Sequence, residues 1–565
     1  MRWNFKSKPD QTQVSQLQKE LQVDELIAKL LVQRGITNYQ EAKTFFRPQL
    51  SDLHDPFLMK DMDKAVIRIQ NAIQNQENIM VFGDYDVDGT TAVSLVASYL
   101  KSKYSNVCTY IPDRYDEGYG ISFKGIDYAS DNEISLIIAL DCGIKSIDHI
   151  AYAKEKNIDF IICDHHRPGD VLPNAVAVLD PKRDDCNYPF DELCGCGIGF
   201  KLIQALAKNY GETTEDLQDY LDLVATAIAA DIVPINGENR ILAYFGLQVI
   251  NSNPRPGLKA LMQNVKKETL NITDVVFILA PRINAAGRIK HGNEAVALLS
   301  EYDLEQAEQF ASEIESYNVS RKELDQQITK EALVQILENN ETEDFTSVVY
   351  NENWHKGVIG IVASRLTETY YRPTLVFTKS GDKLAASARS VIDFDVYNAI
   401  DACSEYLEQF GGHKYAAGMT IKEENFLKFK QAFEDCVKST MPEELRTPEI
   451  AIDTEIEFSE INPKMLRVLK QFEPFGPENR TPVFYCKNAI DTGYAKTMGK
   501  GDEHLKLFVK QENQTNAIGY DAIGFGFGKD LEKVKNRVPF ELVFSIDENE
   551  FQGKITPQIR IKDLK

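Results

Sequence analysis

The chain has 565 residues, of which 43% are hydrophobic and 26% are charged, as in a globular protein rather than a disordered one. At roughly 150 residues per domain, the length predicts about three to four domains. The formal net charge is −23, which argues against nucleic-acid binding, because such domains are usually basic. Local charge decides binding, however, so the total excludes no particular site.

The nine cysteines are widely spaced and odd in number. This pattern disfavours a disulfide framework and favours a reducing compartment. The first residues are polar and do not resemble a signal peptide. No apolar run reaches the roughly 18 residues that a membrane span needs. We therefore expect a cytoplasmic protein that does not cross a membrane.

Residues 1–75 are polar and mostly of helical pattern. Residues 76–300 then alternate short apolar runs with helical stretches. Alternation of buried strands with helices predicts βαβ units around a parallel sheet. The expected strands are Ile79–Phe82, Val107–Ile111, Leu136–Leu140, Phe160–Cys163 and Ala177–Leu179.

A long helical pattern fills residues 301–342. The stretch 303–340 contains no glycine or proline, and Ala307, Ala311 and Ile314 recur at helical spacing. About 38 residues at ~1.5 Å each would span a whole domain. An ordinary core helix, or two helices in series, would give the same pattern. We favour one helix that connects two lobes.

A second α/β region occupies residues 343–445, and residues 446–565 contain mainly short strand patterns separated by turns. The latter pattern predicts a small barrel of antiparallel strands. The expected fold class is therefore α/β, with two α/β lobes joined by a long helix and an all-β C-terminal domain.

Three carboxylates, Asp84, Asp86 and Asp88, lie at alternate positions directly after the predicted strand Ile79–Phe82. Ligands bind α/β folds at the carboxyl ends of parallel strands. Three like charges this close are unfavourable without a cation. A plain turn is the alternative, because Asp and Gly favour turns. A calcium-binding EF-hand loop is excluded, because its twelfth position is Leu95 rather than Glu.

Similar residues end three further elements. Asp141 follows the strand Leu136–Leu140, His165 and His166 follow Asp164 at the next strand end, and Asp231 ends an apolar helical stretch. Carboxylate with imidazole is a ligand set for Mn²⁺ or Mg²⁺ rather than for a thiolate zinc site. We expect these groups to converge on two divalent ions about 3.5–4 Å apart, the arrangement that catalyses phosphoryl displacement.

A second set of residues suits phosphate binding, because guanidinium binds phosphate through two hydrogen bonds. Each arginine alone is more often a surface salt-bridge partner, but the residues together favour a phosphate site. The set is Arg114, Arg282, Asn284, Arg288, Ser387, Arg389, Gly412 and His413.

These segments together resemble a known family. In order along the chain, the segments 83–89, 141–143, 164–166 and 225–231 resemble the four motifs of the DHH phosphoesterase superfamily. The segments 387–390 and 411–413 resemble its DHHA1 domain. Residues 473–479 with the strands that follow resemble the OB-fold of the RecJ branch. Ala227 stands where the fourth motif has glycine, which removes no ligand.

The resemblance implies a 5′-to-3′ exonuclease for single-stranded DNA that releases 5′-mononucleotides in DNA repair and recombination. It implies two divalent ions, Mn²⁺ or Mg²⁺, and single-strand-binding protein and a helicase as partners. We also expect a monomer. Asp141 and His166 would be catalytic. Arg114, Arg288, Ser387 and Arg389 would grip phosphates. The implied metal ligands are Asp86, Asp88, Asp141, His165 and Asp231, with Asp84 as a ligand or a supporting acid.

Two other functions remain open at this stage. One is a phosphodiesterase for short RNA or cyclic dinucleotides, although such relatives usually lack an OB-fold. The other is a non-catalytic single-strand-binding subunit, although such relatives have lost metal ligands. Phe484, Tyr485 and Phe508 are candidate stacking residues, but core packing is the more common role. Because the expected metal ligands end at Asp231, we expect dinucleotide hydrolysis to be independent of the C-terminal domain.

Overall fold

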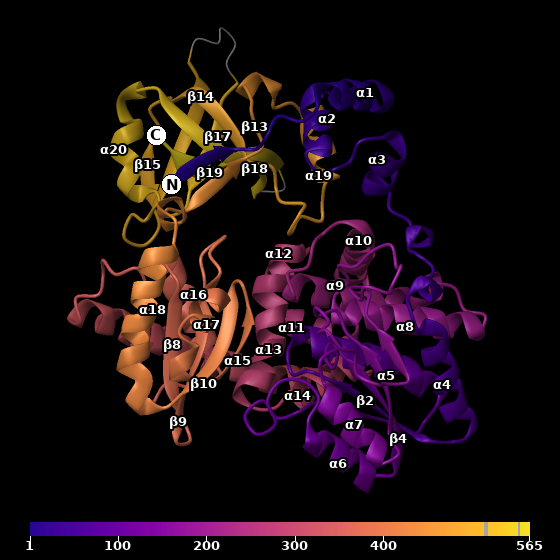
Figure 1. The fold of residues 1–565 in the computed structure, drawn as a ribbon. Helices are drawn as coiled ribbons and strands as arrows, with labels where there is room; N and C mark the ends of the chain where they lie inside the picture. Colours follow the sequence, from indigo (N-terminus) through magenta and orange to yellow (C-terminus); the bar gives the residue numbers. More distant parts are fainter. Residues whose placement is uncertain (513–517, 552–553) are drawn as a thin grey trace.

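The computed structural model describes residues 1–512, 518–551 and 554–565. Two α/β lobes lie side by side, and a β-barrel lies above them with three N-terminal helices next to it (Figure 1). The expected fold class is confirmed. No helix among the described residues has the length and apolar character needed to cross a membrane.

The first lobe is built on a parallel sheet of order β3-β2-β4-β5-β6. Alternate residues of β4 face opposite sides, as a strand requires. Leu136 and Ile138 therefore pack with α4, α5 and α8, whereas Ile137 and Ala139 pack with α6 and α7. The strands are β2 (Asn78–Gly83), β3 (Val107–Tyr110), β4 (Ile134–Leu140), β5 (Asp159–Cys163) and β6 (Ala177–Leu179), and the helices are α4 (Met62–Gln74), α5 (Val87–Lys103), α6 (Phe123–Asp131), α7 (Ile147–Glu155) and α8 (Gly195–Asn209).

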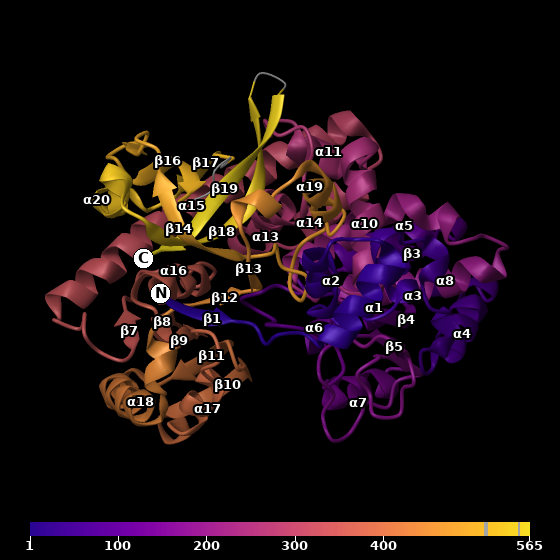
Figure 2. The ribbon, with the colours of Figure 1, turned by 90° about the horizontal axis from the view of Figure 1, so that it is seen from above.

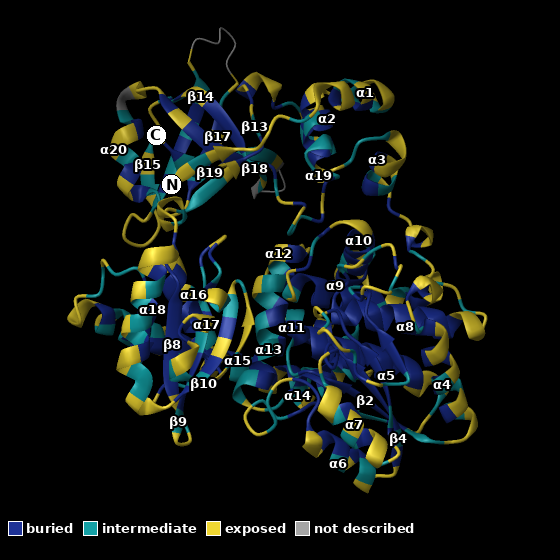
Figure 3. Cartoon of the chain, in the orientation of Figure 1, coloured by how far each residue is buried: buried dark blue, intermediate teal, exposed yellow. Residues whose placement is uncertain are grey.

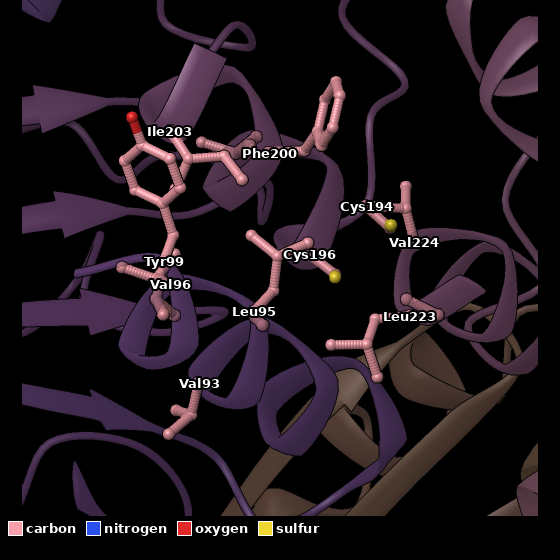
Figure 4. Close-up of a cluster of buried hydrophobic side chains, with 14 of the residues drawn as sticks. Val93, Leu95, Val96, Tyr99, Cys194, Cys196, Phe200, Ile203, Leu223 and Val224 are labelled. Atoms are coloured by element: carbon pink, nitrogen blue, oxygen red, sulfur yellow. The ribbon is translucent and has the colours of Figure 1, made fainter. Parts of the chain in front are cut away.

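A helical layer completes this lobe. Side chains of α5, α8 and α9 form one buried cluster, which includes Val96, Cys196 and Leu223 (Figure 4). Both Cys194 and Cys196 belong to this core, so they have a packing role. The helices of the layer are α9 (Leu221–Ala230), α10 (Gly237–Ser252), α11 (Pro256–Met262), α12 (Ile272–Asp274), α13 (Ala280–Ile289) and α14 (Asn293–Ser300), and a π-helical turn (Val275–Leu279) joins α12 to α13.

One unbroken helix, α15 (Leu304–Glu338), has 35 residues and is about 52 Å long. It begins where Asp303 accepts a hydrogen bond from the Gln306 N–H at 2.9 Å. Its first half contributes Ala307 and Ile314 to the core of the first lobe, and its second half contributes Ile328 and Ala332 to a core of the second lobe. The predicted connecting helix is therefore confirmed.

The second lobe has a mixed sheet of order β10-β11-β9-β8-β7. Only the β7–β8 pair is parallel among its strands. Helices α15 and α16 cover one face, and α17 and α18 cover the other. The elements are β7 (Ser347–Tyr350), β8 (Thr374–Ser380), β9 (Lys383–Arg389), β10 (Leu407–His413), β11 (Ala416–Ile421), α16 (Ile359–Tyr370), α17 (Val396–Asp401) and α18 (Phe426–Thr440).

The C-terminal strands form a closed barrel, because β14 pairs with both β18 and β16 and so completes the ring β14-β18-β19-β17-β16. Two differences from the predicted antiparallel run of short strands appear. The pair β17–β19 is parallel, because ring closure joins strands that are distant in sequence. β18 and β19 also form a long hairpin. The elements are β13 (Thr454–Glu455), α19 (Pro463–Lys470), β14 (Phe484–Asp491), β15 (Lys496–Met498), β16 (His504–Gln511), β17 (Tyr520–Gly524), α20 (Leu531–Val534), β18 (Phe540–Phe551) and β19 (Lys554–Leu564).

The N-terminal stretch is divided between two cores. Its first helices share a core with the barrel, whereas α4 packs on the parallel sheet. Strand β1 pairs in parallel with β12 (Figure 2). Burial is concentrated in the two sheets, in helices α5, α8 and α9 and in the barrel interior, while the outer helix faces are exposed (Figure 3). The bounds are β1 (Arg2–Phe5), α1 (Gln11–Leu21), α2 (Glu25–Val32), α3 (Tyr39–Phe46) and β12 (Glu449–Ile452).

Candidate metal centre and phosphate site

The acidic and histidine residues gather at one edge of the parallel sheet. Asp84 directly follows β2, Asp141 follows β4, and Asp164 follows β5. Asp231 reaches the same place from the C-terminal end of α9. This convergence follows from topology, because parallel strands direct their carboxyl ends to one edge.

His165 is the centre of the group. Its Nε2 lies 3.1 Å from Asp141 Oδ1 and 3.7 Å from both Asp88 Oδ2 and Asp231 Oδ2. Two overlapping sets have ligand atoms within 4.8 Å of one another, Asp88–His165–Asp231 and Asp141–His165–His166. Asp84 and Asp86 lie outside these two sets.

Asp88 is held by the N-terminus of α8. Its carboxylate accepts hydrogen bonds from the backbone N–H groups of Gly195 at 2.6 Å and Cys196 at 2.7 Å, where the helix dipole favours a negative charge. A Cβ on Gly195 would lie 2.6 Å from Asp141 Cβ. Gly195 therefore lets the helix end approach two acidic residues at once. Sequence reasoning missed this role, although the repeated glycines at 195, 197 and 199 were a signal.

Asp164 orients the second histidine. It accepts hydrogen bonds from the N–H groups of Ile144, His165 and His166, and it lies 2.7 Å from His166 Nδ1. Burial opposes charge on both side chains, but their mutual hydrogen bond outweighs it. The pKa of Asp164 falls to about 2, and the pKa of His166 rises to about 9. His166 is therefore a protonated imidazolium at neutral pH, and its hydrogen bond to Asp164 fixes its orientation.

Tyr119 completes this chain of hydrogen bonds and was also missed from the sequence. Its hydroxyl lies 3.2 Å from His166 Nε2 and donates to the Asp141 carbonyl at 3.2 Å. The charged imidazole has Nε2–H as its remaining donor, so the hydroxyl accepts from His166 and donates to Asp141.

The carboxylates carry more negative charge than the site can balance. Burial, followed by repulsion from Asp86, raises the pKa of Asp88 to about 7. Burial and Asp88 raise the pKa of Asp231 to about 8. Burial and Asp88 also raise the pKa of Asp141 well above its ordinary value. Such a cluster is stabilised by a bound cation.

The donors also fit a metal ion chemically. Burial, followed by the charge of His166, lowers the pKa of His165 to about 3, so its imidazole is neutral, as a ligand must be. Asp84 accepts from the Gly120 N–H at 3.3 Å, while its Oδ2 is buried without a hydrogen-bond partner in the described chain. Oxygen ligands with imidazole nitrogen suit Mn²⁺ or Mg²⁺.

The second candidate site joins the two lobes. Arg288 of α13 donates to the Gly357 carbonyl at 3.0 Å, and Tyr115 donates to the Arg288 carbonyl at 2.5 Å. Arg389 at the end of β9 donates to Ser387 Oγ at 3.1 Å. A Cβ on Gly360 would lie 3.1 Å from Arg389 Nη2, so this pair lies against the first turn of α16.

The guanidinium charges here are unbalanced. Burial, followed by the charges of Arg114 and Arg389, lowers the pKa of Arg288. Burial and Arg114 lower the pKa of Arg389. Within the described residues, none of these three arginines has an ion-pair partner. Three cations beside a helix N-terminus suit a phosphate group.

Arg282 does not join them. It donates to Glu315 Oε2 at 2.6 Å and to the Ile278 carbonyl. Positions 284 and 288 are one helical turn apart and share a face of α13, whereas position 282 is on the other face. The sequence proximity of Arg282 to Asn284 and Arg288 was therefore a poor guide to its position.

His413 lies near both sites. Burial lowers its pKa, and the charges of Arg389 and His166 lower it further. Gly412 precedes it on β10 at a φ of 149°, a conformation that favours glycine. Of the candidate stacking residues, Phe484 and Tyr485 are buried in the barrel region, so packing explains them, and Phe508 is half-buried.

A row of aromatic rings links the arginines to the metal centre. The Arg114 guanidinium lies 4.5 Å from the Tyr85 ring centre. The Tyr85 and Tyr119 rings are 6.1 Å apart, and the Tyr119 and His166 rings are 6.0 Å apart. Tyr85 lies between two of the predicted acidic ligands in sequence, a position that offered a signal. The metal centre and the arginine site are therefore connected by a continuous series of side-chain contacts.

The fold and this site define the chain as a DHH-type phosphoesterase. The model of the DHH family, N-terminal domain, matches residues 78–228, and the DHHA1 domain matches residues 343–439. The RecJ OB domain matches residues 452–563.

Among curated proteins, the single-stranded-DNA-specific exonuclease RecJ of Bacillus subtilis is 36% identical over 100% of this chain and 70% of the relative. The Escherichia coli RecJ is 31% identical over 95% of each chain. The structure of RecJ from Thermus thermophilus in complex with Mn²⁺ has a TM-score of 0.84 at 26% identity and covers 100% of this chain and 79% of that one. The chain belongs to the RecJ family.

Substitution of Gly195 by alanine tests the geometry of the centre. The added methyl group would displace Asp141 and the N–H groups that hold Asp88. We expect affinity for Mn²⁺ to fall about 10- to 100-fold, as measured by calorimetry. Gly199→Ala is the matched control in the same helix, because its Cβ would meet Val96 at 3.2 Å and no acidic residue. Equal affinity in the two variants would contradict the assignment.

Mn²⁺ binding should strengthen as the pH rises from 6 to 8. The raised pKa values of Asp88 and Asp231, about 7 and about 8, mean that both are largely protonated at pH 6. The metal ion must displace those protons, so binding is weaker there and releases protons. Titrations at pH 6, 7 and 8 in two buffers with different ionisation enthalpies measure both effects. Affinity independent of pH would show that these carboxylates are not ligands.

Proposed function

We propose that this chain is a metal-dependent exonuclease that degrades single-stranded DNA from the 5′ end and releases 5′-mononucleotides. The observation that supports this proposal most strongly is the pairing of two sites of opposite charge. A carboxylate–histidine centre in the first lobe lies beside a group of arginines that have no ion-pair partner among the residues described above, and the second lobe completes this group. The names of the relatives give the substrate, and the arrangement accounts for a cleavage site next to a phosphate-binding site.

The proposed metal ligands lie at four element ends. Two bound Mn²⁺ or Mg²⁺ ions would activate a water molecule and stabilise the charge that develops on the phosphodiester. Asp141 is the proposed bridging ligand, because its carboxylate lies nearest to His165, the residue common to both ligand sets, and offers two oxygens where an imidazole nitrogen binds one ion. Asp84 remains a ligand or a supporting acid. The ligands are Asp86, Asp88, Asp141, His165 and Asp231.

His166 has a catalytic role in this proposal. Asp164 keeps its imidazole charged at neutral pH, and Tyr119 fixes its orientation. A positioned cation beside the scissile phosphate stabilises negative charge that increases during the reaction. Its position next to the proposed ligand His165 supports this role.

Arg114, Ser387 and Arg389 are proposed to bind the terminal 5′-phosphate. A terminal phosphate has more charge than a diester, and guanidinium and hydroxyl donors distinguish the two. Arg288, Asn284 and His413 would contact phosphates between this pocket and the metals. Gly412 would let the backbone approach a phosphate closely. The ion pair of Arg282 with Glu315 argues against including it. A pocket separated from the metals by one nucleotide would release mononucleotides.

The remaining parts of the proposal rest on composition and on the family. We propose that the chain divides into residues 1–75, 76–300, 301–342, 343–445 and 446–565. The barrel would bind the incoming strand. We also propose a monomer in a reducing cytoplasm that acts with single-strand-binding protein and a helicase; the nine free cysteines support the compartment.

The other two functions receive less support. A phosphodiesterase for very short substrates does not account for the match to the RecJ OB domain. A non-catalytic subunit does not account for the complete acidic and histidine set. We therefore favour the exonuclease over both.

Asp141→Ala tests the metal centre directly. Cleavage of single-stranded DNA should fall at least about 10³-fold, because the bridging group is lost. Binding to the same oligonucleotide with Ca²⁺ present should stay within about twofold of wild type, because the arginines and the barrel remain. Gel assays and fluorescence anisotropy measure the two quantities. Near-normal turnover would disprove the dinuclear assignment.

Arg389→Ala tests recognition of the strand end. One charged hydrogen bond in a buried setting contributes about 1.5–3 kcal/mol, so KM for 5′-phosphorylated DNA should rise about 10- to 150-fold. KM for 5′-hydroxyl DNA should change little, and this substrate is the internal control. Steady-state kinetics on both substrates give the comparison. Equal effects would place the end-binding pocket elsewhere.

A further inference from the structure

The loop Gln471–Asn479, between α19 and β14, docks on the first lobe beside the segment that carries Asp231. The backbone N–H of Ile235 donates to the Pro477 carbonyl at 2.8 Å. A Cβ on Gly476 would lie 2.4 Å from Ile235 Cγ1, so the Gly476 backbone packs closely against the Ile235 side chain. Ile235 is four residues from Asp231, a span of at most about 14 Å along the chain.

Arg240 fixes this loop from the other side. Arg240 belongs to the first turn of α10 and is buried. Its guanidinium carbon lies 3.8 Å from the centre of the Phe45 ring. Within the described residues its hydrogen-bond acceptors are all backbone carbonyls. A buried cation without those acceptors is unfavourable, so the loop backbone is held in one arrangement. The acceptors are the carbonyls of Phe45, Gln471, Phe472, Glu473 and Pro474.

Asn479 closes the loop on itself. Its side-chain amide donates to the carbonyls of Phe472 at 2.7 Å and Pro474 at 2.9 Å, and its oxygen accepts from Arg34 at 2.9 Å. Asn479 is 2% exposed. Phe472 is buried against the rings of Phe45 and Phe46. The loop is therefore a rigid junction between the N-terminal helices, the barrel and the first lobe.

The segment that follows Asp231 begins with an exposed residue and is held in place further along the chain. Helix α9 holds Asp231 from its N-terminal side through a hydrogen bond to the Ala227 carbonyl. The next residue, Ile232, has a φ of 59° and is 64% exposed. The following anchors are the Asn239 amide, which donates to the Pro234 carbonyl at 3.1 Å, and then the docked loop.

We propose that the loop Gln471–Asn479 is a brace that positions the Asp231 carboxylate for metal binding, with Arg240 and Asn479 as positioning residues. This inference rests on the metal centre proposed above. It gives the C-terminal domain a role in metal binding in addition to holding the strand. It also opposes the sequence-based expectation that dinucleotide hydrolysis is independent of that domain.

Asn479→Ala is the first test, and Asn462→Ala is its matched control. Asn462 caps α19 by accepting from the Met465 N–H at 2.9 Å, so this control also loses an asparagine hydrogen bond in the C-terminal domain but leaves the loop contacts intact. Loss of outer partners typically weakens metal binding 10- to 100-fold. We expect Asn479→Ala to weaken Mn²⁺ binding about tenfold, measured in the full chain from the electron paramagnetic resonance signal of free Mn²⁺. An equal change in both variants would overturn the proposal.

Gly476→Ala is the second variant and decides the question if Asn479→Ala does not fold. Its methyl group would push Ile235 away, so we again expect weaker Mn²⁺ binding. For a 5′-phosphorylated dinucleotide, the Mn²⁺ concentration at half-maximal rate should rise about tenfold while KM at saturating Mn²⁺ stays constant. Wild-type Mn²⁺ affinity in this variant would overturn the brace. Because the main readout is metal affinity, failure of the exonuclease proposal would be seen separately, in the wild-type protein.

Discussion

Mutual repulsion of carboxylates at one edge of the parallel sheet is the constraint on which the rest of the site depends. Asp88, Asp141 and Asp231 surround one neutral imidazole within 3.7 Å of its Nε2. The fold opposes their repulsion with oriented dipoles, chiefly the N-terminus of α8. These backbone dipoles are fixed by the helix and do not neutralise the negative charge of the carboxylates. The centre can therefore still bind a cation.

The same reasoning accounts for the conflict between the net charge of −23 and a polyanionic substrate. The acidic residues at the sheet edge would be neutralised by metal ions, which reverse the sign of the local field. The arginines shared with the second lobe remain unpaired in the described chain. Helix α15 contributes to cores in both lobes, so together with the hydrogen bond from Arg288 to the Gly357 carbonyl it fixes the position of the second lobe relative to the metal centre.

The sequence allowed Asp84, Asp141 and Asp164 to be placed because each follows an apolar run typical of a buried strand, and Asp231 because it ends an apolar helical stretch. The long helix was predictable for a similar reason, since no glycine or proline interrupts it. A small barrel was predicted, but its parallel pair β17–β19 was not, because this pair joins segments that are distant in sequence. Local patterns carry no information about such pairs.

The residues of the candidate site likewise fall into those that local sequence patterns predict and those that only contacts between distant segments reveal. Asp141 and His165 were found from their strand ends, whereas Gly195 and Tyr119 act through contacts with residues far away in sequence. Arg282 was grouped with Arg288 because they are close in sequence, but they lie on different faces of one helix. The docking of residues 471–479 on the first lobe could not be predicted from the sequence either, because it depends on how the N-terminal helices, the barrel and the first lobe are arranged.

The central claim is that the metal centre and the arginine pocket act on the same strand, one nucleotide apart. The most direct measurement is the product distribution over time from single strands labelled at the 5′ or the 3′ end and incubated with Mn²⁺, with a labelled blunt duplex in parallel. The account predicts that the 5′ label appears from the start as a mononucleotide, that the 3′ label remains in gradually shortening strands, and that the duplex stays intact. Early release of the 5′ label in longer fragments, or equal digestion of the duplex, would contradict it.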